Sequence, residues 1–323
     1  MAKPIAISCG EPAGIGPEVA TQAWQAVGRD IPLLWIGDPS HLPDGTPIKV
    51  VDTAADASGV KDALPVLAQD FGAARSAGKP NPQHATGVIA AIETGVALTM
   101  RNEARAICTA PIHKAALIDG ADFAYPGHTE FLAALAGDVP VVMMLASEML
   151  KVVPATIHIP LSDVPSALTA DVLVDTILVT HAALRRDFGI KSPRIAIAGL
   201  NPHAGEDGKM GMEEIDMIAP IVARFRSDGM DIAGPMSADT MFHPAARARY
   251  DAAICMYHDQ ALIPIKTLDF AGGVNVTLGL PFIRTSPDHG TAFDIAGKGC
   301  ADATSMIAAL RMASEMADAR DHG

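Results

Sequence analysis

The sequence predicts an α/β protein, and two observations support that prediction. Short apolar runs of strand length alternate with longer segments whose apolar residues recur at helical spacing, as in α/β proteins. Clusters of polar residues repeatedly follow the strand-like runs, where open α/β sheets bind their ligands. The chain has 323 residues, 49% of them hydrophobic, so it can form one large domain or two medium ones with a sizeable core.

The first predicted strand, residues 5–8, runs into Gly10-Glu11-Pro12-Ala13-Gly14-Ile15-Gly16-Pro17-Glu18. A helix is predicted from about Pro17, because proline suits a first helical turn and Glu18 favours the positive end of a helix. The further predicted strands are 33–38, 48–51, 104–109, 139–145, 152–158, 194–199 and 252–256. The further predicted helices are 85–100, 171–188, 211–227 and 301–316. Residues 53–84, rich in Ala, Gly, Asp and Pro, are predicted to be irregular.

Composition and charge exclude several classes of protein. There are 24 Lys and Arg against 37 Asp and Glu, a net charge of −13, and 4% aromatic residues, which argues against a nucleic-acid partner. No apolar run reaches the length of a membrane span, and the N-terminus lacks the layout of a signal peptide. The four cysteines lie far apart, so we expect reduced thiols and a cytoplasmic protein.

The glycines after the first strand only superficially resemble a dinucleotide-binding fingerprint. Gly14 and Gly16 match its first two positions, but Val19 stands at the third and Pro17 follows the second. A tight strand-to-helix turn explains these glycines better than a Rossmann fold does.

Three of the eleven histidines follow apolar strand-like runs, namely His158, His203 and His258. Three neutral imidazoles without a fourth protein ligand would make an open catalytic metal site, with a donor set that suits zinc better than magnesium. Asp259 and Asp239 are candidates for orienting a ligand or handling a proton. A single histidine is more often a core or surface residue, and these separations are too long for a local zinc motif.

A second group of polar residues suits an anionic ligand. His128-Thr129 opens a predicted helix, whose free backbone N–H groups favour an anion. Lys266 and Arg284 add cations and Asn275 adds an amide, so together they could bind a phosphate and a carboxylate. The alternative is ordinary capping by Thr129, with both cations in solvent.

Read together, these motifs resemble the 4-hydroxythreonine-4-phosphate dehydrogenase family of pyridoxal 5′-phosphate biosynthesis. The resemblance covers nearly the whole chain and is carried by residues 10–18, Tyr125-Pro126-Gly127-His128-Thr129-Glu130, residues 199–206, Ala238-Asp239-Thr240, Tyr257-His258-Asp259-Gln260 and residues 277–299. The chain departs from the family pattern twice. Glu11 stands where aspartate is usual, and His113 stands where asparagine is usual.

The resemblance implies a fold like that of isocitrate and isopropylmalate dehydrogenases, with two α/β/α domains around a central cleft in an obligate homodimer. Residues 1–125 with 273–323 would form an outer domain on the nucleotide side. Residues 126–272 would form an inner domain carrying the dimer contacts and the metal side.

The resemblance also implies residue roles. His158, His203 and His258 would be the metal ligands, two from one subunit and the third from its partner, with zinc favoured over magnesium or cobalt. The substrate contacts would be His128, Thr129, Lys266, Asn275 and Arg284. From the residues themselves, Lys266, Asp259 and Asp239 are the candidate catalytic groups.

The implied reaction is NAD-dependent oxidation of 4-phosphooxy-L-threonine at C3, followed by decarboxylation to 3-amino-2-oxopropyl phosphate and CO2. The segment His289-Gly290-Thr291-Ala292-Phe293-Asp294-Ile295 resembles the adenosine-binding loop of NAD-dependent isopropylmalate dehydrogenases. Asp294 would accept hydrogen bonds from the ribose and repel the 2′-phosphate of NADP. The alternatives are that Asp294 only caps a turn, and that the chain is a paralogue acting on a phosphorylated threonate or erythronate or on a cis-diol carboxylate.

Overall fold

The computed structural model describes residues 3–322, and these form two compact units. Unit 1 contains the described residues up to Val139 together with Leu280–Asp318. Unit 2 contains Pro140–Gly279 and the described residues from Ala319 onward. The predicted domain boundaries were at 125/126 and 272/273, whereas the two units divide at 139/140 and 279/280, and the described residues from 319 onward lie in unit 2.

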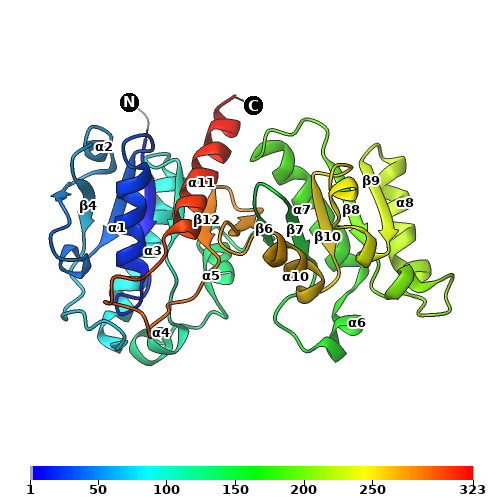
Figure 1. Ribbon diagram of the computed structural model, residues 1–323, viewed down its shortest axis with the longest axis horizontal. Helices are drawn as coiled ribbons and strands as arrows, with labels where there is room; N and C mark the ends of the chain where they lie inside the picture. Colours follow the sequence, from blue (N-terminus) through cyan, green and yellow to red (C-terminus); the bar gives the residue numbers. More distant parts are fainter. Residues whose placement is uncertain (1–2, 323) are drawn as a thin grey trace. The chain divides into compact units, whose positions relative to one another are not determined.

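Unit 1 is built on parallel strands in the order β3-β4-β2-β1-β5-β12. They are β1 Ile5–Ser8, β2 Leu33–Gly37, β3 Ile48–Val50, β4 Leu64–Ala68, β5 Ala106–Thr109 and β12 Arg284–Pro287. Its helices are α1 Gly16–Val27, α2 Ala54–Ala57, α3 Ala85–Met100, α4 Lys114–Ala121, α5 His128–Leu135 and α11 Thr304–His322, the last of which ends in unit 2 (Figure 1). Short 3-10 turns lie at η1 Pro39–His41 and η2 Pro82–His84.

Unit 2 has the strand order β11-β6-β7-β10-β8-β9. The strands are β6 Val142–Ala146, β7 Lys151–Pro154, β8 Arg194–Ala198, β9 Asp231–Met236, β10 Ala252–Cys255 and β11 Val274–Leu278. β7, β10, β8 and β9 are parallel, whereas β6 is antiparallel to both β7 and β11. Its helices are α6 Val164–Ala167, α7 Ala170–Arg186, α8 Ala219–Ser227, α9 Pro244–Arg247 and α10 His258–Leu268, with a π turn at Glu214–Ile218 and 3-10 turns at Leu161–Asp163, Pro202–Gly205 and Ala238–Thr240.

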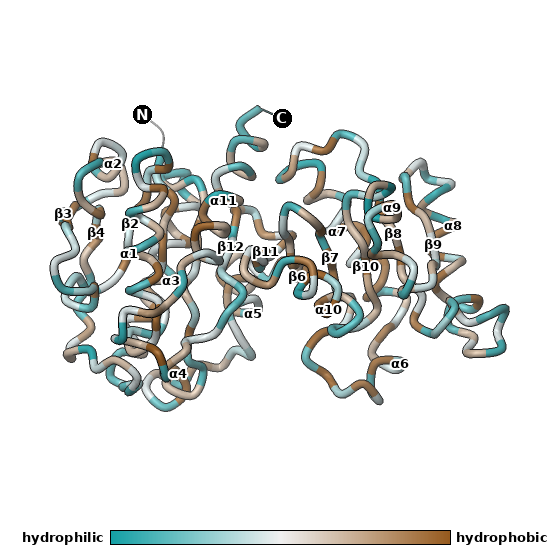
Figure 2. The backbone as a smooth tube through the Cα atoms, in the orientation of Figure 1, coloured by the Kyte–Doolittle hydropathy of each residue, from teal (hydrophilic) through white to brown (hydrophobic). Residues whose placement is uncertain are grey.

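The strands form because they are short, nearly continuous apolar runs that can be buried on both faces. All four residues of β1 and all five of β2 are buried, and Trp35 is among the largest side chains with no exposed surface. In unit 2, Ile195–Ala198 of β8 and all of β10 are buried in the same way. The hydrophobic colour in Figure 2 accordingly runs along the strands of each unit. The predicted α/β class is confirmed.

One local prediction is wrong. Residues 53–84 were expected to be irregular, but they contain α2, β4 and the η2 turn. β4 pairs with β2 on one side and β3 on the other, although Pro65 within it has no N–H to donate. The apolar neighbours Leu64 and Val66 are buried, and that burial outweighs the missing donor.

No single helix among residues 3–322 is long and apolar enough to cross a membrane. The pair Leu161–Ala167 and Ala170–Arg186 meets the length and composition criteria only when taken together, across a bend of 86°.

Candidate active-site residues in the two units

The three histidines predicted as metal ligands follow three neighbouring strands of unit 2. His158 lies beyond β7, His258 opens α10 after β10, and His203 lies in the turn after β8. β10 is parallel to both β7 and β8, so all three histidines follow carboxyl ends at one edge of the sheet. This is the edge at which open α/β sheets bind ligands.

Two of these histidines lie side by side. The ring centroids of His158 and His258 are 5.7 Å apart, with the ring planes inclined by 43°. Both rings line a pocket of about 320 Å³, together with Thr156, Tyr257 and Asp259. Asp259 Oδ1 lies 2.7 Å from His258 Nδ1, so the carboxylate orients the imidazole and leaves Nε2 for a ligand. Two imidazoles with a carboxylate behind one of them are a donor set that fits a divalent metal.

His203 stands apart from this pair. Its side chain is 63% exposed, and its Nδ1 lies 3.8 Å from Glu206 Oε2. Within residues 3–322 of a single chain, no three His, Cys, Asp or Glu side chains are placed to hold one metal ion. One copy of the chain therefore brings together only two of the three predicted ligands.

The other predicted catalytic and substrate-contact groups of unit 2 lie on three different elements. Asp239 lies in the 3-10 turn after β9 and accepts a hydrogen bond from Ser237 Oγ at 2.6 Å. Lys266 lies near the end of α10, with Nζ 5.6 Å from the centroid of the Phe270 ring. Asn275 is half-buried on β11, opposite Leu145 of β6.

The predicted phosphate contacts of unit 1 include a buried cation, Arg284. Arg284 opens β12, is 3% exposed, and donates from both Nε and Nη2 to Thr109 Oγ1, at 3.2 and 2.7 Å. Burial lowers its pKa to about 10, which still leaves the guanidinium charged at neutral pH. A permanent positive charge with little access to water is a strong point of attachment for a phosphate.

His128 and Thr129 begin α5, as predicted, with Gly127 preceding the helix. His128 Nε2 is buried and lacks a hydrogen-bond partner among residues 3–322. Burial, followed by the positive charge of Arg284, holds the pKa of His128 well below its usual value. The ring is therefore neutral, and its buried nitrogen is available to a ligand.

The predicted cofactor residues lie in a turn-rich segment between β12 and α11. His289 Nδ1 lies 2.9 Å from Gly290 O, Thr291 O accepts from Ile15 N at 3.0 Å, and Ile295 N donates to Ala292 O. Asp294 is exposed. The glycine-rich turn after β1 therefore does contact the predicted nucleotide segment, although it is not itself a Rossmann fingerprint.

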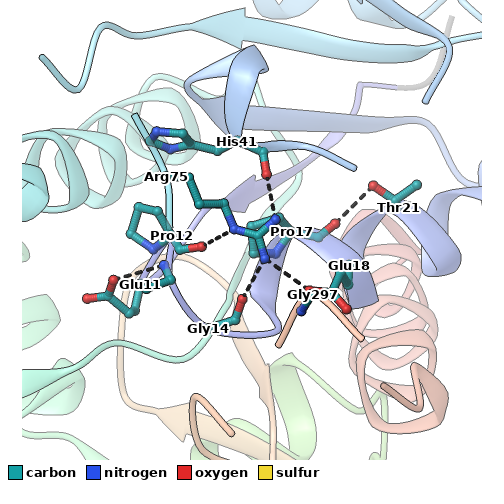
Figure 3. A network of polar contacts seen from close by, with 10 residues as sticks. Glu11, Pro12, Gly14, Pro17, Glu18, Thr21, His41, Arg75 and Gly297 are labelled. Carbon is teal, nitrogen blue, oxygen red and sulfur yellow. Dashed lines mark hydrogen bonds and ion pairs between the residues drawn. The ribbon is translucent and has the colours of Figure 1, made fainter. Parts of the chain in front are cut away.

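Two functional candidates escaped sequence reasoning. Arg75 is partly buried in a network with the backbone around Pro12 and Gly14 and with the Glu18 carboxylate, as Figure 3 shows. Glu18 was predicted only to favour the positive end of α1, but it also accepts from Gly297 N of the nucleotide segment. No local pattern singles out Arg75, because its partners are far away in the sequence.

The two departures from the family pattern lie in the same unit. Glu11 is buried and accepts from Ala13 N at 3.0 Å. Burial raises the pKa of Glu11, and the hydrogen bond from Ala13 and the nearby His84 and His113 oppose that shift. His113 meets Phe293 of the nucleotide segment edge to face, with ring centroids 5.0 Å apart.

Residues 31–313 match the family model described as "Pyridoxal phosphate biosynthetic protein PdxA". The 4-hydroxythreonine-4-phosphate dehydrogenase of Ruegeria sp. (strain TM1040) is 62% identical over 98% of this chain and 97% of that protein. The solved 4-hydroxythreonine-4-phosphate dehydrogenase of Klebsiella pneumoniae is 38% identical, with a TM-score of 0.89 over 98% of this chain and 100% of that one. A solved terephthalate 1,2-cis-dihydrodiol dehydrogenase from Burkholderia xenovorans LB400 is 25% identical, with a TM-score of 0.67 over 98% of each chain. The chain belongs to the family of the pyridoxal phosphate biosynthetic protein PdxA.

Proposed function

We propose that this protein oxidises the C3 hydroxyl of 4-phosphooxy-L-threonine with NAD, in a metal-dependent reaction within pyridoxal 5′-phosphate biosynthesis. The β-keto acid formed then loses CO2 to give 3-amino-2-oxopropyl phosphate. The observation that carries the proposal is the His158–His258 pair backed by Asp259, in a chain 62% identical to a protein named for this activity.

His158 and His258 would hold a divalent metal, and His203 of a second copy of the chain would complete the set. We favour zinc, with magnesium and cobalt as the alternatives, because three imidazoles are a soft donor set. When bound, the metal supplies Lewis acidity that lowers the pKa of the substrate hydroxyl. Asp259 keeps the His258 ring in the tautomer that leaves Nε2 free to coordinate. The functional form is therefore a homodimer, and we place it in the cytoplasm.

The phosphate of the substrate is bound by Arg284, by neutral His128 and by the N-terminus of α5 at Thr129. Arg284 stays charged although buried, so it forms a strong ionic contact, while His128 supplies an N–H without adding charge. Attachment of this unreactive end provides binding energy that orients the reacting end.

At the reacting end, Lys266 and Asn275 contact the substrate, and Lys266, Asp259 and Asp239 handle protons. When bound, NAD would supply the hydride acceptor, and the chemistry of that transfer would belong to the nicotinamide. Asp294 is exposed in the predicted nucleotide loop, where a carboxylate can accept hydrogen bonds from the adenosine ribose.

The test measures NADH formation from 4-phosphooxy-L-threonine after chelation and after add-back of zinc, magnesium or cobalt, with release of CO2 followed in parallel. A panel containing phosphorylated threonate and erythronate and a cis-diol carboxylate runs beside it, because one solved relative is named for a cis-dihydrodiol. Arg101→Met is the control, since Arg101 forms only an exposed ion pair with Glu103. Faster turnover of any panel member, or full activity in chelator, would contradict the proposal.

A further inference from the structure

Arg75 joins three separate segments of unit 1. Its side chain is 14% exposed, and the guanidinium donates to Pro12 O, to Gly14 O at 3.2 Å and to His41 O at 3.3 Å. Its Nη2 also donates to Glu18 Oε1 at 3.0 Å. Figure 3 shows the guanidinium between the turn after β1, the start of α1 and the backbone of His41. The planar five-donor fork of arginine suits such a set of acceptors, whereas the ammonium of lysine has only three donors.

Glu18 connects this network to the predicted nucleotide loop. Its side chain is 8% exposed, and Oε1 accepts both from Arg75 and from Gly297 N, the latter at 2.7 Å. In Figure 3 the Glu18 carboxylate thus links the Arg75 guanidinium to Gly297 of the segment 291–297. A shift of Arg75 would therefore reach that segment through Glu18.

The segment 291–297 lies directly on the backbone that Arg75 organises. A Cβ at Gly14 would lie 2.7 Å from Thr291 O, and a Cβ at Gly78 would lie 2.8 Å from Phe293 O. Gly78 N also donates to Ala13 O at 2.8 Å. With so little space, a small displacement of either supporting turn must move the segment as well.

A buried ion pair of this kind is a poor source of stability, because removing two charges from water costs about as much as their attraction returns. The Arg75–Glu18 pair is better explained as a device that positions the backbone, because a guanidinium with all of these bonds formed allows only one arrangement of its acceptors. Three of the four acceptors of Arg75 belong to the parts of the chain that contact the segment 291–297: Pro12 O and Gly14 O in the turn after β1, and Glu18 Oε1. The fourth is His41 O.

We propose that Arg75, acting through Glu18, is a positioning residue that holds the segment 291–297 in place for the adenosine half of the nicotinamide cofactor. This inference rests on the proposed function, because it takes NAD to be the ligand of that segment. Arg75 itself touches neither cofactor nor substrate. Its role is to set the position of the loop that does.

The experiment uses the full-length protein with Arg75→Met, Arg75→Lys, Glu18→Gln and the double variant Arg75→Met/Glu18→Gln. Calorimetry gives the Kd of NAD and, separately, the Kd of 4-phosphooxy-L-threonine, while hydrogen exchange follows the peptide covering residues 288–300. Arg194→Met is the matched control, because it removes a partly buried ion pair with Asp251 in unit 2. Thermal unfolding identifies any variant that is simply less stable.

We expect Arg75→Met to raise the Kd of NAD by about tenfold or more and to speed exchange in 288–300, because it removes a charge-assisted hydrogen bond. The Kd of the phosphorylated substrate stays within about twofold of the parent. Arg75→Lys recovers part of the loss, and the double variant is no worse than the poorer single variant, since the residues act as one unit.

Unchanged exchange in 288–300, an NAD Kd within about twofold of the parent, or an equal effect of Arg194→Met would overturn the inference. An error in the proposed function itself would give a different result from an error in this inference. In that case the parent itself does not bind NAD, and the inference fails with it.

Discussion

Arg284 offers the sharpest test of the phosphate site, because its burial has a cost that can be worked out. Burial lowers the pKa of Arg284 from its ordinary value to about 10. At about 1.4 kcal/mol for each tenfold change in the acid constant, the folded protein carries the buried cation at a cost of roughly 3 kcal/mol. A basic group whose pKa is lower in the folded protein than in the unfolded chain lowers the free energy of unfolding at every pH at which the group is charged in both states. The cost is therefore present at neutral pH and fades as the pH rises through about 10.

Arg284→Met removes that cost together with the hydrogen bonds of the guanidinium, which include two to Thr109 Oγ1, each contributing about 1 kcal/mol. We therefore expect the free energy of unfolding of the ligand-free variant to stay within about 1–2 kcal/mol of the parent, or to increase. The affinity for the phosphorylated substrate should fall by about 30- to 1,000-fold, because a buried charged contact contributes about 2–4 kcal/mol.

The measurements are urea unfolding without ligand and calorimetric titration with 4-phosphooxy-L-threonine and with its unphosphorylated analogue. Thr109→Val is the matched control, because it removes the hydroxyl that accepts from Arg284 while leaving the cation in place. A variant that binds the phosphorylated substrate like the parent, or that loses more than about 3 kcal/mol of stability, would show that Arg284 is a structural residue instead.

The remaining predictions concern the metal, the dimer, the cofactor and pH. His258→Ala should abolish turnover in metal-limited buffer while leaving thermal unfolding unchanged, and near-parent activity would refute its assignment as a ligand. Mixing His203→Ala with His258→Ala subunits should restore activity at one site of each heterodimer. Mixing His158→Ala with His258→Ala subunits should not, because His158 and His258 of one chain belong to the same site. The opposite pattern would overturn the shared site. Asp294→Lys should reduce a preference for NAD over NADP that we expect to be about a hundredfold, measured as the ratio of kcat/KM values, and a parent that uses both equally would exclude Asp294 as the selector. Burial and then the charge of Arg284 keep the pKa of His128 well below 6.5, so the unfolded chain takes up a proton below that pH and the folded protein does not. Stability should therefore fall by up to about 1.4 kcal/mol per pH unit below pH 6.5. His128→Gln should flatten that part of a urea-unfolding series, and an unchanged slope would contradict the shift.

The sequence by itself determined the fold class and most of the elements. The predicted helix at 85–100 coincides with α3, and α5 begins at His128 as predicted, because helical periodicity and the residues at helix ends are local signals. Sequence also identified the polar positions after β7, β8 and β10, since these follow recognisable apolar strands. Where local signals conflict, as at Pro65, the prediction was wrong and long-range strand pairing decided the outcome.

Only the tertiary structure decided which of these residues meet. Nothing in the spacing of the three histidines says that His158 and His258 are neighbours while His203 stands apart, because strand order in a sheet is independent of order in the chain. Arg75 was invisible in the sequence for the same reason, since its acceptors lie 34 to 63 positions away. The pKa values of Arg284 and His128 were equally undetermined, because they depend on burial and on a charge brought close by folding.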